Sequence, residues 1–100
     1  SDAIKGWKLH HEMVLNLVVP VGSIRFVIFD NREGSKTKGR FGDFVLSRNN
    51  YGRLTIPPKL WVGFQGIDVQ DSLLLNIASI PHDPDESESK RLNEIDYDWN

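Results

Sequence analysis

The fold class is decided by the stretch MVLNLVVPVGSIRFVIF, residues 13–29. It contains two short apolar runs, residues 13–19 and 24–29, separated by Pro20-Val21-Gly22. The runs are rich in branched and aromatic residues, which favour strands, and proline with glycine between them predicts a turn. Short apolar runs divided by turn residues are typical of a β-sandwich or barrel.

The same pattern continues along the chain in both directions from this stretch. Further apolar runs are predicted strands at residues 41–46, 53–56, 60–65 and 73–80, and Asn49-Asn50, Pro57-Pro58 and Pro81 interrupt the chain between or after them. Glycine and proline recur too often for long helices. One hundred residues make one domain. We therefore expect an all-β barrel over residues 1–82 and a short polar C-terminal arm over residues 83–100, which docks on the barrel or on a partner subunit.

The arm differs from the barrel in charge and pattern. Residues 1–60 carry ten Lys/Arg and five Asp/Glu, whereas residues 61–100 carry two and nine. A basic body suits a small anionic ligand, although a solvated surface with an acidic tail explains the same balance. Residues 83–93 are predicted to form a helical turn or an extended arm. Ile95, Tyr97 and Trp99 then alternate with acidic residues and need a surface to cover.

Composition excludes several classes of function. The basic residues are dispersed and the isoelectric point is about 5.8, which argues against nucleic acid. No apolar run approaches the length of a membrane span, and no leader pattern is present, so we expect a cytoplasmic protein. The absence of cysteine removes disulfides, thiol nucleophiles and thiolate metal sites. No glycine-rich phosphate loop or nucleophile elbow is found.

Polar residues inside apolar strands are the best candidates for a site. His10, Glu12 and Asn16 share one parity and would share one face if the first strand begins that early. Asn76 interrupts another apolar run. A buried unpaired amide costs on the order of 1–3 kcal/mol, so these groups require a partner or a ligand. Either they line a polar cavity able to bind a sugar, or the asparagines bond the backbone of a bulge or turn.

Other candidates are weaker. His11 has the opposite parity, and His82 lies in a proline-flanked loop. His10 with Glu12 is too sparse for a metal site, which needs three or four ligands. Some aromatic residues have the right chemistry to stack on a base or sugar, although packing is their commoner use. These aromatic candidates are Trp7, Tyr51, Trp61 and Phe64.

A set of motifs across nearly the whole chain resembles the dTDP-4-dehydrorhamnose 3,5-epimerase family and its cupin relatives. The set comprises residues 4–10, 16–22, 29–32, 46–47 and 50–51, Gly34-Ser35 with Thr37 and Gly39, Thr55-Ile56-Pro57-Pro58, Gly63-Phe64 and Tyr97-Asp98-Trp99. The resemblance implies a cupin jelly roll. Because related proteins have strands before the Gly6-Trp7 motif, we expect either missing N-terminal strands or an edge supplied by a neighbouring subunit, and hence a homodimer.

The resemblance also implies a chemistry. In that family a histidine oriented by an aspartate removes a proton next to a sugar ketone, a lysine stabilises the enolate and a tyrosine protonates the other face. His10 matches the base and Asp98 its orienting acid, while Asn16 and Asn76 fall near the positions of the lysine and the tyrosine. Val62 replaces a histidine before Gly63-Phe64. These replacements argue against the two-site epimerase mechanism and against a metal-dependent cupin dioxygenase.

The sequence therefore predicts a metal-independent, cofactor-free protein acting on a dTDP-4-keto-6-deoxyhexose in surface polysaccharide biosynthesis. Expected ligand contacts are Glu12, Asn16, Asn76, Tyr51, Trp61 and, for the diphosphate, Arg25, Arg40 or Arg53. Two alternatives are a non-catalytic carbohydrate- or nucleotide-sugar-binding cupin and a structural dimerising domain whose cavity is filled with side chains.

Overall fold

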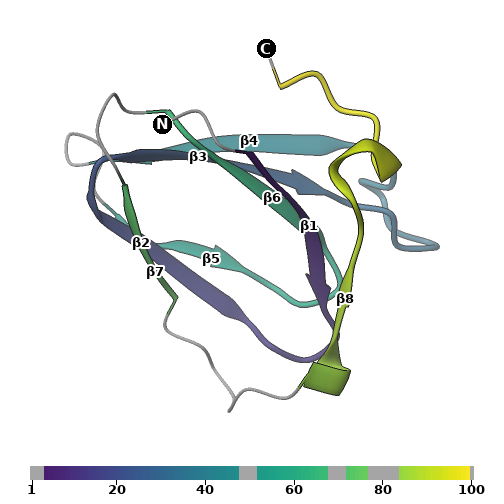
Figure 1. Ribbon diagram of the computed structural model, residues 1–100. Coiled ribbons are helices and arrows are strands. Elements are labelled where there is room, and N and C mark those ends of the chain that lie inside the picture. The colour runs from purple at the N-terminus through teal and green to yellow at the C-terminus, as the bar shows by residue number, and fades with distance from the viewer. Residues whose placement is uncertain (1–3, 48–51, 68–71, 77–83, 100) are drawn as a thin grey trace.

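The computed structural model describes residues 4–47, 52–67, 72–76 and 84–99, which form two β-sheets facing each other (Figure 1). The larger sheet has the strand order β4-β3-β6-β1-β8, and the smaller one β5-β2-β7. Their bounds are β1 Ile4–His10, β2 Leu15–Val21, β3 Ser23–Phe29, β4 Phe41–Ser47, β5 Leu54–Ile56, β6 Trp61–Gly66, β7 Leu73–Asn76 and β8 Ser87–Ser89, with 3₁₀ turns η1 Pro84–Glu86 and η2 Leu92–Glu94.

The pairings between these strands are all antiparallel, and the predicted all-β jelly roll is confirmed. Strand β2 shows why the sequence folds this way. Leu15, Leu17 and Val19 are buried, while the residues between them are half-buried, so one face of the strand points into the sandwich. The chain leaves β2 for the larger sheet at Gly22, whose φ of 82° is readily adopted only without a Cβ.

The core between the sheets is made of side chains from both. Phe26 and Ile56 are almost fully buried there, at 0% and 1% exposure. The other buried members of this core are Met13, Leu15, Leu17, Val19, Ile24 and Val62. The cavity described below opens beside this core.

Most strand bounds differ from the sequence predictions by one or two residues, and some differences affect the site. The run predicted at 13–19 begins two residues later, at Leu15, because residues 11–14 turn the chain from β1 into β2. The run predicted at 73–80 is a strand over Leu73–Asn76, and its remaining residues lie outside the described part. Strands β1 and β8 were not predicted as such, and β8 occupies part of the segment expected to be helical or extended.

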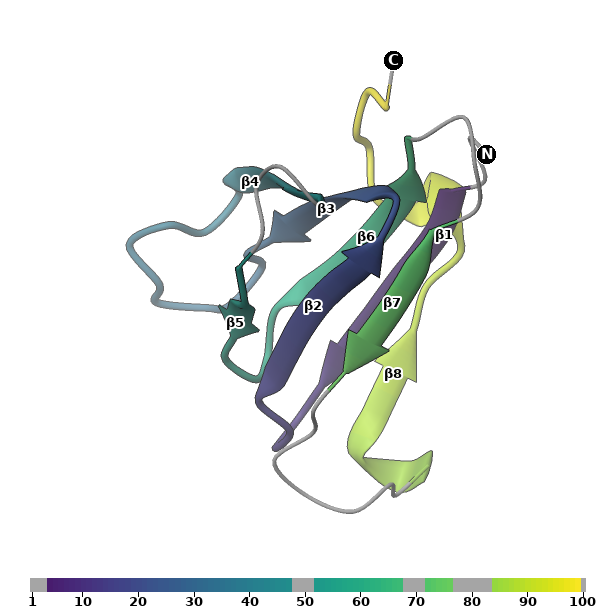
Figure 2. The same ribbon diagram turned by 90° about the vertical axis from the view of Figure 1, so that its left-hand side faces the viewer.

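A second apolar cluster covers the outer face of the larger sheet. Trp7, Val27 and Ile95 are buried in it, and Tyr97 and Trp99 pack against its side. Strand β8 runs beside β1 before the chain crosses to this face (Figure 2). The larger sheet is therefore covered on both faces, on one by the smaller sheet and on the other by the segment that carries Ile95, Tyr97 and Trp99.

The loop between β3 and β4 is organised by one carboxylate. Asp30 is 5% exposed and accepts hydrogen bonds from Arg32, Ser35 and Thr37. The Arg32 guanidinium, followed by the two hydroxyls, holds the pKa of Asp30 well below its ordinary value. Arg32 is therefore committed to loop structure.

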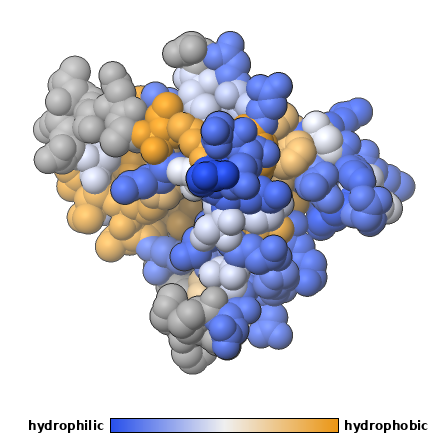
Figure 3. Space-filling model, turned by 45° about the vertical axis from the view of Figure 1, so that its right-hand side comes forward, coloured by the Kyte–Doolittle hydropathy of each residue, from blue (hydrophilic) through white to orange (hydrophobic). Residues whose placement is uncertain are grey.

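Several large apolar side chains remain exposed on strands that pair on one side only in the described structure. Phe44 and Val45 lie on β4, and Leu73 and Leu75 lie on β7. In the view of Figure 3, hydrophobic atoms gather on one side of the molecule and hydrophilic atoms cover most of the rest. No helix among the described residues is long and apolar enough to cross a membrane.

Candidate functional site

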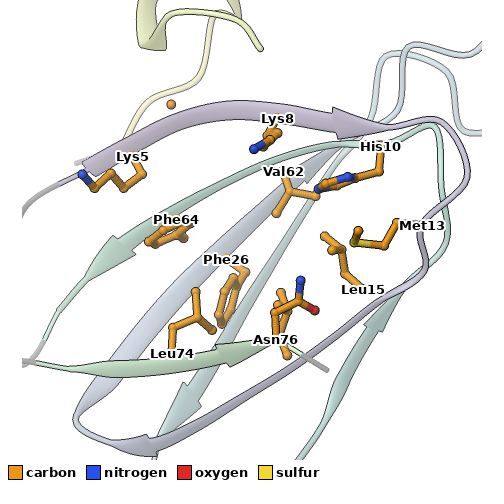
Figure 4. Close-up of a pocket in the computed structure, with 12 residues that line it drawn as sticks. Lys5, Lys8, His10, Met13, Leu15, Phe26, Val62, Phe64, Leu74 and Asn76 are labelled. Carbon is orange, nitrogen blue, oxygen red and sulfur yellow. The ribbon is translucent and has the colours of Figure 1, made fainter. Parts of the chain in front are cut away.

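A cavity of about 410 Å³ opens between β1 of the larger sheet and β7 of the smaller one (Figure 4). Its size is within the range of small-molecule sites, and its lining is mainly apolar with a few polar groups, as such sites usually are. The lining residues are Lys5, Gly6, Lys8, His10, Met13, Leu15, Leu17, Phe26, Val62, Phe64, Leu74 and Asn76. The open space contradicts the alternative in which side chains fill the hollow.

Strand β1 supplies the basic side of the cavity because its side chains alternate. Trp7 and Leu9 point to the outer face and are buried under the C-terminal segment. Lys8 and His10 point the other way and line the cavity. The His10 side chain is 14% exposed, so the imidazole is accessible from the cavity but largely shielded from solvent.

The imidazole of His10 is oriented by Glu86. His10 Nδ1 contacts Glu86 Oε1, and Glu86 Oε2 accepts the backbone N–H groups of Glu12 and Met13, both at 3.1 Å. The backbone N–H of His11 also donates to the Glu86 carbonyl, at 2.7 Å. One carboxylate thus fixes both the turn after β1 and the ring before it. With Nδ1 engaged, Nε2 is the ring nitrogen left to accept a proton from a ligand.

Glu86 is held in its ionised form. The hydrogen bond from His10 lowers its pKa from 4.5 to about 2, with help from the two backbone N–H groups and against the opposing effect of burial. A buried carboxylate beside an imidazole is the arrangement that keeps a histidine in one tautomer and stabilises its protonated form. The pair is suited to general acid–base catalysis.

Glu86→Gln is expected to destabilise the protein at pH 7. A neutral amide cannot accept from the imidazole and both backbone groups at once. Because the pKa of Glu86 is lowered on folding, its contribution to stability is fully present above pH 4.5 and is lost as the pH falls towards about 2. The difference in free energy of unfolding between variant and parent, measured with urea, should therefore shrink over that interval.

Glu88→Gln is the matched control. Glu88 pairs with His11 at 2.8 Å, but its side chain is 57% exposed. Its replacement should change stability by no more than about 0.5 kcal/mol. A Glu86→Gln protein with unchanged stability at pH 7, or with a deficit that does not vary between pH 5 and 2, would contradict the role assigned to the carboxylate.

The structure brings only one of the two predicted asparagines to the cavity. Asn76 lines it from β7, opposite His10. Asn16 lies on the outward face of β2, where Thr55 Oγ1 donates to its side-chain oxygen at 3.0 Å. Its backbone N–H donates to Asn76 Oδ1 at 3.3 Å. The prediction that Asn16 shares a face with His10 is wrong because the turn at residues 11–14 breaks the parity between the two strands.

Glu12 and Asp98 are also placed away from the cavity. Glu12 is exposed in that same turn and contributes its backbone N–H to Glu86. Asp98 is exposed between Tyr97 and Trp99, which pack on the outer face of the larger sheet. The acid that orients His10 is therefore Glu86, and the assignment of Asp98 is corrected.

Arg25 is engaged on the outer face as well. Its guanidinium donates to Asp43 Oδ2 at 2.9 Å, to the Trp99 carbonyl at 2.9 Å and to the Tyr97 hydroxyl at 3.1 Å. The bond to Asp43 chiefly raises the pKa of Arg25. These contacts anchor the C-terminal segment, so Arg25 is not a group that contacts a ligand in the cavity.

The remaining predicted contacts do not line the cavity either. Arg40 lines a separate hollow beside β4, and Arg53 is exposed before β5. Trp61 is buried in the outer-face cluster, with Lys90 Nζ 5.1 Å from the centre of its ring. Adjacent residues of β6 alternate, so Val62 faces the cavity and Trp61 cannot. Tyr51 lies outside the described residues.

Sequence reasoning missed three residues of the site. Lys8 has the same parity as His10 within β1. Recognising β1 as a strand would therefore have predicted that Lys8 lies on the same face as His10. Lys5 has the opposite parity, and only the strand irregularity described below turns it inward. Glu86 is 76 residues from His10 in the chain and lies in a segment without periodicity, so nothing local predicted the contact.

The described residues contain no group of three or more His, Cys, Asp and Glu side chains able to hold a metal ion. The polar groups that line the cavity are two lysines, one imidazole and one carboxamide. They suit an organic ligand with hydroxyl, carbonyl or anionic groups.

Comparison with known proteins shows that the chain is similar to sugar epimerases and isomerases. No protein-family model matches the chain. A probable low-salt glycan biosynthesis epimerase, Agl13 of Haloferax volcanii, is 33% identical over 102 residues that cover 97% of this chain and 65% of the relative. A dTDP sugar isomerase from Desulfovibrio desulfuricans G20 superposes with a TM-score of 0.88 at 40% identity, covering 91% of this chain and 59% of that one.

A dTDP-4-dehydrorhamnose 3,5-epimerase from Elizabethkingia anophelis NUHP1 shares the fold, with a TM-score of 0.84 at 21% identity over 99% of this chain and 57% of that one. The two-sheet sandwich is therefore the cupin-type fold of these epimerases. The chain is similar over nearly its whole length to a glycan biosynthesis epimerase and to a dTDP sugar isomerase, which supports an epimerase-like family. It spans about three fifths of the length of these relatives.

Proposed function

We propose that the chain forms the catalytic part of a metal-independent sugar-nucleotide epimerase or isomerase that acts on a dTDP-4-keto-6-deoxyhexose for surface polysaccharide biosynthesis. The observation that carries the proposal is the His10–Glu86 pair in an open cavity. The names of the relatives, a glycan biosynthesis epimerase and a dTDP sugar isomerase, support the substrate class. We expect the protein to work in the cytoplasm.

The proposed reaction begins with His10 Nε2 taking a proton from the carbon next to the sugar ketone. The electron pair of the broken C–H bond forms a C=C bond, and the carbonyl oxygen takes the negative charge of the enolate. Glu86 stabilises the imidazolium that results. Return of the proton to the same carbon regenerates the starting ketone. If that carbon carries a hydroxyl, the enolate oxygen can instead take a proton, the neighbouring hydroxyl lose one and the former carbonyl carbon be protonated by His10, which gives the isomer in which ketone and hydroxyl have exchanged places.

The lining favours a reaction with one acid–base group over a two-site epimerisation. Among the described residues that line the cavity, His10 is the only histidine, and none is tyrosine, aspartate or glutamate. Asn76 lies across the cavity from His10 and can hydrogen-bond a sugar hydroxyl or carbonyl, but it cannot deliver a proton as a tyrosine does. Exchange and isomerisation on one face of the sugar are the chemistry that this set supports.

Solvent deuterium incorporation tests the proposal. The chain is incubated in D₂O with a dTDP-4-keto-6-deoxyhexose, and the sugar carbon next to the ketone is followed by NMR. Incorporation above the rate without protein is the expected result. Tight binding of the same sugar nucleotide without incorporation would contradict catalysis. It would favour the second candidate, a non-catalytic nucleotide-sugar-binding cupin. Asn76 favours this candidate because its neutral side chain can bind a sugar but cannot deliver a proton.

We also propose that the protein is a homodimer. Strands β4 and β7 each pair on one side only in the described structure, and they expose Phe44, Leu73 and Leu75. An apolar unpaired edge is a site for strand pairing between copies. Light scattering should give about twice the chain mass of 11.4 kDa, and Leu75→Lys should shift the species towards monomer. A monomer at all concentrations would contradict the proposal.

A further inference from the structure

Strand β1 carries an irregularity that places two lysines on the same side as His10. Lys5 pairs with Phe64, but Lys8 pairs with Val62, so the register shifts by one residue between them. Without the shift, residues three apart would point to opposite faces. The bulge turns both lysines inward, and their partners Phe64 and Val62 line the cavity with them.

The two lysines give the cavity a positive charge that its walls do not balance. None of the twelve residues that line it is acidic. The arginines considered for an anionic ligand are elsewhere: Arg25 is bonded on the outer face, Arg40 lines another hollow and Arg53 does not line the cavity. The described cations available to a ligand in this cavity are therefore Lys5 and Lys8.

The order of the groups along β1 also fits a sugar nucleotide. A strand rises about 3.3 Å per residue, so Lys8 is about 7 Å along the strand from His10, with Lys5 beyond it. Figure 4 shows Lys5, Lys8 and His10 in that sequence along one wall. In a nucleotide sugar the diphosphate is bonded directly to the ring. A diphosphate bonded to a ring beside His10 would be within reach of Lys8 and Lys5, the two lysines that line this cavity.

We propose that Lys8 and Lys5, turned inward by the β1 bulge, bind the diphosphate of the nucleotide sugar. This inference rests on the proposed function for the identity of the ligand. The lysines contribute binding and orientation, and the acid–base step remains with His10. Lysine suits this role as a compact cation with three donors, which can hold phosphate oxygens without the planar fork of arginine.

Calorimetric titration with dTDP tests the assignment. Lys8→Met and Lys5→Met keep the aliphatic stem and remove the charge, and each should weaken dTDP binding about tenfold. The affinity of the parent should fall with added salt, and the double variant should lose most of that dependence. Lys8→Arg, which keeps the charge, should bind within about threefold of the parent.

The control is Lys36→Met, since Lys36 is an exposed lysine of the β3–β4 loop outside the cavity. It should leave dTDP binding unchanged. The inference is overturned if both cavity variants bind dTDP within twofold of the parent, if Lys36→Met weakens binding equally, or if millimolar dTDP does not bind the parent. Deuterium exchange distinguishes failure of the lysine assignment from failure of the proposed function. Exchange with lysine-independent binding rejects only the lysine assignment, whereas lysine-dependent binding without exchange rejects only catalysis.

Discussion

His10→Asn is expected to reduce deuterium incorporation into the keto sugar by about 10²–10⁴-fold, the range in which general acid–base groups contribute. Asparagine is chosen because its side-chain nitrogen takes the approximate place of Nδ1 and can still donate to Glu86. The contact that orders the turn at residues 11–14 is then preserved. What disappears is Nε2, the atom proposed to accept the proton. Binding of dTDP should change by less than about threefold, so the loss should appear in the rate.

The neighbouring histidine provides the control for this prediction. His11 does not line the cavity, and its side chain is 38% exposed and pairs with Glu88. His11→Asn should leave the exchange rate within about twofold of the parent. Exchange that survives in His10→Asn to within tenfold, or that is lost equally in His11→Asn, would show that the imidazole in the cavity is not the base.

Local pattern was enough to predict most of the sandwich. The apolar runs that became β2, β3, β4, β5 and β6 were found because each combines strand-forming residues with a turn residue at its end. Strand β1 was missed because Lys5, Gly6 and Lys8 interrupt its apolar residues. Strand β8 has no apolar residue at all, and it forms because β1 offers an edge to pair with. Such a strand is created by tertiary structure.

The site was predicted in part, and the reason is geometric. His10 and Asn76, two of the residues proposed from the sequence, line the same cavity from different sheets. The error over Asn16 came from carrying strand parity through residues 11–14, which are a turn. Parity holds within one strand only. Lys5 was not predicted to line the cavity for a related reason. A bulge reverses the parity inside β1, and no residue type in that strand predicts the bulge.

Contacts between distant segments were the least predictable part. Glu86 reaches His10, and Arg25 reaches the Tyr97 hydroxyl, across separations of 76 and 72 residues. A carboxylate in an acidic segment carries no signal of its future partner. The alternation of Tyr97 and Trp99 with acidic residues predicted that they pack on a surface. The sequence did not predict that this surface is the outer face of the larger sheet. This packing depends on a single buried ring, Trp7, which joins the sheet to the tail.

Trp7→Ala is expected to cost about 3–5 kcal/mol of unfolding free energy, as large-to-small changes of a buried tryptophan do. Trp7 is 1% exposed, and its ring centre is 5.6 Å from that of Trp99 and 6.5 Å from that of Tyr97. Its Nε1 donates to the Leu92 carbonyl at 3.3 Å. Alanine leaves a cavity under the tail, and the Leu92 carbonyl loses its hydrogen-bond donor. The loss is a large share of a typical domain stability of about 5–15 kcal/mol.

Urea unfolding measures this loss, and Phe44→Ala is its control because Phe44 is 45% exposed on β4 and should cost less than about 1 kcal/mol. If Trp7→Ala does not fold, Trp7→Phe keeps an aromatic ring while losing the bond to Leu92, and should show a smaller loss in the same direction. Amide hydrogen exchange adds a local readout. The backbone bonds between Trp7 and Lys90, at 3.1 and 2.8 Å, should open more readily in either variant. A variant as stable as Phe44→Ala, with unchanged protection at Lys90, would mean that the tail is held to the sheet without this ring, through Arg25 and its bonds to Tyr97 and Trp99.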